Sequence, residues 1–78
     1  MEHDLDARDL VCPMPVLRAR KALKSLAAGD RLVIRVTDPA APEDFRVFCE
    51  ATGHVLAGIE PDAEEDDVTV VRIDKAAD

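Results

Sequence analysis

The sequence is short of positive charge, of long hydrophobic runs and of glycine, and each shortage excludes a class of function. Ten Lys and Arg residues stand against seventeen Asp and Glu, for a net charge of −7. Because phosphate binding rests on basic side chains, no direct nucleic-acid partner is expected. The longest uncharged apolar stretch, 10–17, contains two prolines and falls well short of the roughly 20 residues of a membrane-spanning helix. Three glycines provide no glycine-rich phosphate loop.

Cysteine and histidine are also scarce. The two cysteines, Cys12 and Cys49, do not form a Cys-x-x-Cys motif, and with the two histidines they are too scattered to predict a zinc site. We therefore expect no metal and no cofactor. The acidic start of the sequence lacks the basic-then-apolar plan of a signal peptide, so we expect a cytoplasmic protein that does not associate with membranes. Thiols stay reduced in that compartment, and two cysteines do not imply a disulfide.

The length of 78 residues predicts one domain spanning 1–78. Hydrophobic periodicity and turn residues predict, in order, a strand, a helix, a strand, a helix and two strands, over 4–8, 13–27, 31–37, 42–52, 54–59 and 68–73. Helices with a single apolar stripe need one sheet face to cover. The fold class expected is an α/β (α+β) two-layer sandwich, with both helices on one face of a four-stranded mixed sheet.

The residue patterns also predict which side chains face the core. The stripe of the first helix consists of Val16, Ala19, Leu23, Leu26 and Ala27, and that of the second consists of Phe45, Phe48, Cys49 and Thr52. Cys49 is therefore expected to be buried and inert. The opposite face of the sheet is expected to direct four side chains towards solvent or a partner, namely Arg31, Val33, Arg35 and Thr37.

Cys12 is the candidate for chemistry. It directly precedes Pro13, the predicted first helical residue, where unpaired backbone N–H groups and the helix dipole favour a thiolate. We predict a pKa below that of a free thiol. Pro13 and Pro15 sacrifice no helical hydrogen bond in the first turn and stiffen the start of the helix. These residues alone leave open the alternative that Cys12 is a small buried hydrophobe.

The residues around Cys12 argue against two more specific reactions. Cys12 and Arg18 have the Cys-x5-Arg spacing of cysteine phosphatases, but two of the five intervening residues are prolines, which offer no N–H to a phosphate. A Cys–His pair could use only His3, in an end expected to fray, or His54, at the start of a strand. A single activated sulfur without a base, metal or pocket suits a group carried on the sulfur itself, as in persulfide exchange.

The first helix is basic, although the whole chain is acidic. Its charged residues are Arg18, Arg20, Lys21 and Lys24, whereas residues 60–67 contain six acids and no base. A positive face beside the thiol would attract acidic partner proteins, and we predict that Arg18 and Lys21 assist docking. The alternative is that these charges form only a solvated face.

Several segments resemble one known family. They are Leu5-Asp6-Ala7, Leu10-Val11-Cys12-Pro13-Met14-Pro15-Val16, Gly29-Asp30, Thr37-Asp38-Pro39, Phe48-Cys49 and Gly53-His54. In this order they resemble the TusA/SirA-like sulfur-carrier family, whose mark is Cys-Pro-x-Pro opening the first helix. The resemblance covers essentially the whole chain.

The resemblance implies a two-layer sandwich and a cytoplasmic carrier rather than a turnover enzyme. Cys12 would receive sulfane sulfur from a cysteine desulfurase or rhodanese and pass it on as a persulfide, to a DsrE-like or other sulfur-relay protein. Family members serve tRNA thiolation, molybdenum-cofactor formation or sulfur oxidation. The family usually has glycine where Asp9 stands. A side chain and negative charge there are expected to constrain the loop and to oppose thiolate formation.

Two alternatives to the carrier remain at this stage. One is a non-catalytic interaction or regulatory module in which Cys12 is structural. The other is a redox switch, in which Cys12 reacts with an oxidant and an external thiol.

Overall fold

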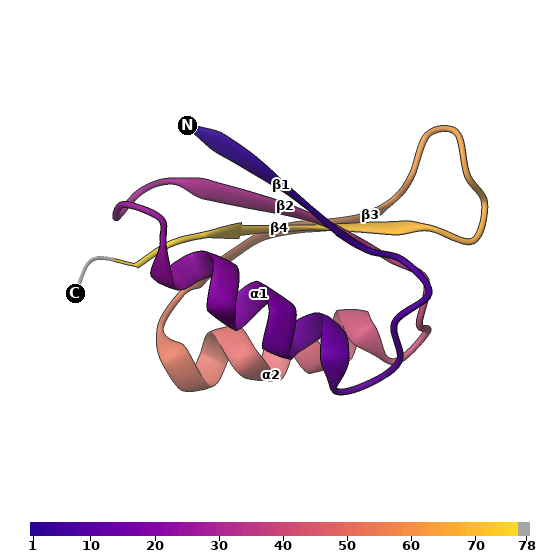
Figure 1. The fold of residues 1–78 in the computed structure, drawn as a ribbon, viewed down its shortest axis with the longest axis horizontal. Coiled ribbons are helices and arrows are strands. Elements are labelled where there is room, and N and C mark those ends of the chain that lie inside the picture. Colours follow the sequence, from indigo (N-terminus) through magenta and orange to yellow (C-terminus); the bar gives the residue numbers. More distant parts are fainter. Residues whose placement is uncertain (77–78) are drawn as a thin grey trace.

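The computed structural model describes residues 1–76 and has the predicted order of elements. They are β1 (Glu2–Ala7), α1 (Met14–Lys24), β2 (Arg31–Val36), α2 (Ala41–Thr52), β3 (Val55–Pro61) and β4 (Thr69–Asp74). The strands form one mixed sheet in the order β1-β2-β4-β3, in which only the β1–β2 pair is parallel. Both helices lie side by side against one face of this sheet (Figure 1). The predicted fold class is confirmed.

The core lies between the sheet and the two helices. Alternate residues of β2 and β4 point to the helices, because side chains of a strand alternate between its faces. The buried cluster comprises Ala7, Ala19, Leu23, Leu32, Ile34, Val36, Ala41, Phe45, Cys49, Val71 and Ile73. Cys49 is 5% exposed, and burial raises the pKa of its thiol, so the packing role predicted for it is confirmed.

The first helix is shorter than predicted. It ends at Lys24, although Leu26 and Ala27 continue the apolar stripe. The chain turns instead at Gly29, whose φ of 89° is left-handed and whose backbone N–H donates to the carbonyl of Lys75 at 2.9 Å. The helix stops early because the turn before β2 is tied to the end of β4. The second helix ends as predicted, at Gly53 with φ 84°.

The first strand begins earlier than predicted. Glu2 is already paired with Arg31, and the backbone N–H of Arg31 donates to the carbonyl of Met1 at 2.9 Å. His3 lies within β1, with Nε2 3.2 Å from a carboxylate oxygen of Asp30. The expectation that the first three residues fray is therefore wrong, because parallel pairing with β2 holds them.

The face of the sheet opposite the helices carries ion pairs between neighbouring strands. Arg31 pairs with Asp74 at 2.7 Å, and Arg72 pairs with Glu60. Val33, predicted to face solvent or a partner, is only 6% exposed, because it lies in register between charged neighbours of β1 and β4. This face presents charged groups rather than an apolar surface.

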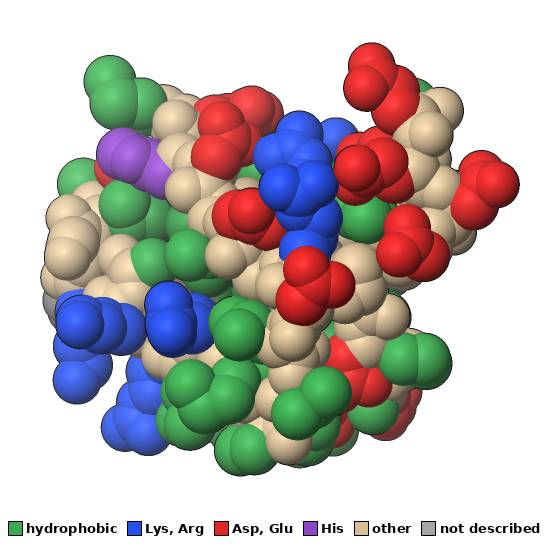
Figure 2. All heavy atoms as spheres, turned by 45° about the vertical axis from the view of Figure 1, so that its right-hand side comes forward, with side chains coloured by type: hydrophobic (Ala, Val, Ile, Leu, Met, Phe, Trp, Pro, Cys, Tyr) green, Lys and Arg blue, Asp and Glu red, His purple; other side chains and the backbone are tan. Residues whose placement is uncertain are grey.

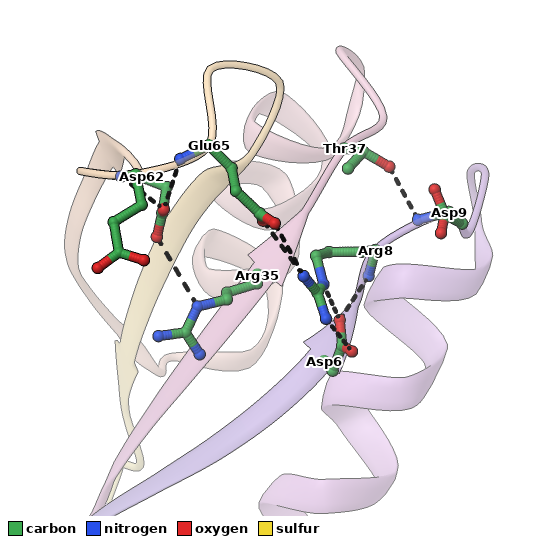
Figure 3. Close-up of polar contacts among 8 residues, drawn as sticks. Asp6, Arg8, Asp9, Arg35, Thr37, Asp62 and Glu65 are labelled. Carbon is green, nitrogen blue, oxygen red and sulfur yellow. Dashed lines mark hydrogen bonds and ion pairs between the residues drawn. The ribbon is translucent and has the colours of Figure 1, made fainter.

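An ion-pair network ties the β3–β4 turn to the end of β1 (Figure 3). Arg8 donates to Asp6 at 2.8 Å and to Glu65 in the turn at 3.2 Å. Arg35 of β2 lies 3.8 Å from Asp62. The acidic turn is thereby attached to the segment that leads into α1. Within residues 1–76, no helix is long and apolar enough to cross a membrane.

Candidate functional site at the start of the first helix

Cys12 is exposed in the loop between β1 and α1. Its backbone N–H donates to a carboxylate oxygen of Asp38 at 2.7 Å, and the backbone N–H of Asp9 donates to the hydroxyl of Thr37 at 2.9 Å. Thr37 and Asp38 follow β2. Because β1 and β2 are parallel, the loops that follow them leave the same end of the sheet and can hold one another. The alternative of a buried, purely structural Cys12 does not fit this exposure.

Asp9 adopts a backbone conformation that favours glycine. Its φ is 65°, in the left-handed region where a side chain costs about 1 kcal/mol. The constraint predicted for the loop is therefore present. The predicted opposition of Asp9 to thiolate formation is not, because the acids that act on the Cys12 thiol are Asp44 and Asp38.

The pKa of Cys12 is raised, so the prediction of a lowered pKa is wrong. The largest cause is a hydrogen bond between the thiol and the Asp44 carboxylate, followed by desolvation and by the negative charges of Asp44 and Asp38. A neighbouring carboxylate disfavours a second negative charge. The sequence signal was available. Asp44 lies in the acidic first turn of α2, and parallel β1–β2 pairing brings the start of α2 to the same end of the sheet as Cys12.

The two prolines occupy different positions around Cys12. Pro13 is the N-cap of α1 and is exposed, so the helix proper begins one residue later than predicted, at Met14. Pro15 is buried and anchors the first turn against the core. The role of these prolines in holding the sulfur at the tip of the helix stays a prediction.

An apolar surface surrounds the thiol. Cys12 opens onto a groove between the starts of the two helices, which is lined by Cys12, Pro13, Val16, Asp44, Val47 and Phe48. Large hydrophobic side chains in the loop before α1 and in its first turns are also exposed, namely Val11 at 69%, Met14 at 37% and Leu17 at 47%. Figure 2 shows hydrophobic side chains gathered at this end of the molecule. The residue patterns did not predict this patch, although Val11 and Leu17 lie outside the predicted apolar stripe.

In Figure 2 one group of basic side chains lies beside the apolar surface, at the lower left, and most acidic side chains lie above it, around a second basic group. Arg18 and Lys21 are exposed on α1, as predicted from the helical spacing. Neither they nor Arg20 and Lys24 pair with an acidic side chain within residues 1–76. The Arg18 and Lys21 side chains are therefore available to a partner.

The histidines are engaged elsewhere in the fold. His54 accepts a hydrogen bond from the backbone N–H of Ala76 at Nδ1, 3.0 Å away, and its ring lies 5.9 Å from that of Phe48. His3 contacts Asp30. Neither lines the groove at Cys12. In the part of the chain that the structure describes, no three His, Cys, Asp or Glu side chains gather to hold a metal ion.

The fold and the site define a class of protein: a small α+β domain that presents one exposed thiol where its first helix begins. Comparison with known families gives this class a name. The profile of the family described as Sulfurtransferase TusA matches residues 3–75, and the chain belongs to this family of sulfur carriers.

Individual relatives agree with the family. A putative sulfur carrier protein of Neisseria meningitidis serogroup A is 51% identical over 63 residues, which are 81% of this chain and 80% of that protein. Sulfur carrier protein TusA of Allochromatium vinosum is 42% identical over 55 residues, covering 70% of this chain and 72% of that protein. The crystal structure of a SirA-like protein from Desulfitobacterium hafniense superposes with a TM-score of 0.76 at 29% identity, covering 99% and 100% of the two chains.

Proposed function

We propose that this protein relays sulfane sulfur as a persulfide on Cys12. The observation that carries the proposal is the exposed Cys12 thiol at the start of α1, in a chain of the TusA family. In the loading step, the Cys12 thiol loses its proton and the thiolate attacks the outer sulfur of a donor persulfide. The donor's S–S bond breaks, the donor cysteine leaves as a thiolate, and Cys12 carries the S–S bond. No net oxidation occurs.

The chemical class of the partners follows from this step. The donor is a protein that holds a cysteine persulfide, and we propose a cysteine desulfurase or a rhodanese. The acceptor is a DsrE-like or other sulfur-relay protein in the cytoplasm. The sulfur delivered would serve tRNA thiolation, molybdenum-cofactor formation or sulfur oxidation. The exposed apolar surface around Cys12 supports transfer between docked proteins, because such surfaces favour protein contacts.

The Asp44 carboxylate supports a carrier over a redox switch. By raising the pKa of Cys12 it disfavours the thiolate, the form that peroxide oxidises. A docked partner that places a cation beside Asp44 would release this restraint, so that the thiolate forms where transfer takes place.

The direct test is the mass of the intact protein after incubation with a cysteine desulfurase and free cysteine. We expect the mass of one added sulfur atom, removable by a reducing thiol. The adduct should be absent from Cys12→Ser and retained by Cys49→Ser, which alters only the buried cysteine. Absence of an adduct on the wild-type protein with several desulfurases and rhodaneses would support the regulatory-module alternative.

A further inference from the structure

A second hollow adjoins the groove at Cys12. It lies between the later turns of α1 and α2 and is lined by Arg20, Leu23, Lys24, Phe48, Thr52, His54 and Lys75. Phe48 lines both hollows, and α1 and α2 lie side by side under the sheet (Figure 1). The two hollows therefore adjoin at Phe48, and the helix groove is the name used below for the two together, from Cys12 to Lys24.

The two ends of the helix groove differ in charge. The end at Cys12 is apolar apart from the Asp44 carboxylate. The far end gathers Arg20, Lys24 and Lys75, and within residues 1–76 none of the three pairs with an acidic side chain. The Lys75 ammonium donates to the carbonyl of Leu26 at 2.6 Å, which fixes it at this end. Three cations in one place on a chain of net charge −7 form a local site for anionic groups.

The length of the helix groove sets the size of its occupant. Pro13 and Lys24 are eleven residues apart, which corresponds to about 16 Å along a helix. An extended peptide covers this distance with about five residues. A segment with one residue over Cys12 therefore reaches the cationic end within one short stretch.

We propose that the helix groove binds an extended acidic segment of a partner protein, in which a reactive cysteine lies over Cys12 and a carboxylate about five residues away contacts Arg20 and Lys24. The proposal rests on the proposed function for the role of Cys12. It deepens that function by stating the chemistry of the partner. A nucleic acid fits the helix groove less well, because Asp44 and the apolar half offer nothing to further phosphates and the acidic β3–β4 turn repels a polyanion.

The test uses short peptides as probes. Each contains one cysteine held as a disulfide with an aromatic thiol, followed about five residues later by two aspartates or, in its matched partner, two lysines. Because the helix groove does not fix the chain direction, each peptide is made in both orders. The Cys12 thiolate attacks the peptide sulfur and displaces the aromatic thiolate, whose absorbance gives the rate. At low salt we expect the better acidic peptide to react roughly fivefold faster than its lysine partner, with little difference at about 1 M salt.

Two double variants separate the helix groove from general electrostatics. Arg20→Glu with Lys24→Glu should abolish or reverse the preference. Arg46→Glu with Arg72→Glu changes the net charge equally, but neither residue lines the helix groove, so most of the preference should remain. The Cys49→Ser background ensures that only Cys12 reacts, and circular dichroism confirms folding.

Three results would overturn the proposal: equal rates for acidic and lysine peptides, equal loss in both double variants, or competition by a short RNA but not by a cysteine-free acidic peptide. The last result would assign the cationic end to nucleic acid. Failure here leaves the persulfide adduct on Cys12 intact, because that adduct is measured without any peptide. Conversely, a peptide preference without a persulfide adduct would retain the helix groove and refute the carrier function.

Discussion

At the scale of single residues, two aspartates that follow β2 act on Cys12: Asp38 in the loop and Asp44 in the first turn of α2. Asp38 accepts the Cys12 backbone N–H, which holds the loop in place. The Asp44 carboxylate lines the same groove as the thiol and raises its pKa. The isolated protein therefore holds its sulfur in position and disfavours its ionisation, and we propose that a partner's cation beside these two acids would favour the thiolate.

The first prediction concerns Asp44. Replacing it with asparagine removes the charge that most raises the pKa of Cys12, so the thiolate fraction near neutral pH should rise and alkylation by iodoacetamide should become several-fold faster. The rate is measured across a pH series in a Cys49→Ser background. Glu50→Gln, an exposed acid of the same helix, serves as the control and should leave the rate unchanged. An Asp44→Asn protein with the wild-type pH profile would contradict the assignment.

The second prediction concerns Asp9. Glycine at this position relieves the left-handed strain but increases the freedom of the unfolded chain, and aspartate tolerates this conformation better than most residues. We expect Asp9→Gly to raise the free energy of unfolding by about 0.5 kcal/mol, and Asp9→Val to lower it by about 1 kcal/mol or more. Urea denaturation measures both. A more stable Asp9→Val protein would show that the loop does not hold this conformation.

At the scale of elements, the sequence predicts the helices and strands well where side-chain periodicity and terminators agree. Gly53 ends α2 as expected. The backbone at this position is left-handed, a conformation that glycine adopts without strain. For α1 the apolar residues Leu26 and Ala27 mimic a further helical turn. What ends the helix is the pairing of the Gly29 turn with Lys75, a contact across 46 positions that no local pattern contains.

The site was predictable in position but not in electrostatics. Cys12 and its prolines can be singled out from the sequence because the relevant signals lie within a few residues of one another. The influence of Asp44 depends on how two separate helix starts meet at the end of parallel strands. The start of α1 alone predicts a lowered pKa for Cys12, because the helix dipole favours the thiolate. The acids that raise this pKa lie in α2 and the loop before it, far from Cys12 in the sequence.

The third prediction belongs to the outer face of α1. Arg18 and Lys21 make no ion pair within residues 1–76, and we propose that they guide acidic donor proteins. Reversing both charges should slow persulfide transfer from a desulfurase several-fold at low salt and much less at high salt, because screening removes long-range attraction. Reversal of Arg46, whose charge is already neutralised by Glu43 and Glu50, is the control. Equal rates for both proteins would mean that Arg18 and Lys21 are merely solvated.

At the scale of the whole molecule, carboxylates stabilise the fold through many small contacts. Arg8 lowers the pKa of Asp6 to about 2. Backbone N–H groups of Glu64 and Glu65 lower the pKa of Asp62, and the Arg31 guanidinium lowers that of Asp74. These acids connect β1, the β3–β4 turn and β4, so their ionisation is linked to the stability of the sheet.

The fourth prediction follows from these shifts. A carboxyl whose pKa is lower in the folded state contributes stability above its unfolded pKa of about 4, and loses that contribution as the pH falls through the folded value. The urea midpoint should therefore fall progressively between about pH 4 and pH 2. Asp6→Asn should flatten part of this decline, and Asp67→Asn, which removes an acid that makes no ion pair within residues 1–76, is the control. A midpoint that rises as the pH falls would contradict the linkage.

The direction of β1 has a consequence for how the carrier can be attached to other things. Met1 lies at one end of this strand and Cys12 follows its other end, about 20 Å away for six residues (Figure 1). A tag, dye or additional protein fused before Met1 is therefore attached at the end of the molecule opposite Cys12. Such a tether would leave the cargo end unobstructed, so that an immobilised carrier can still meet one protein after another.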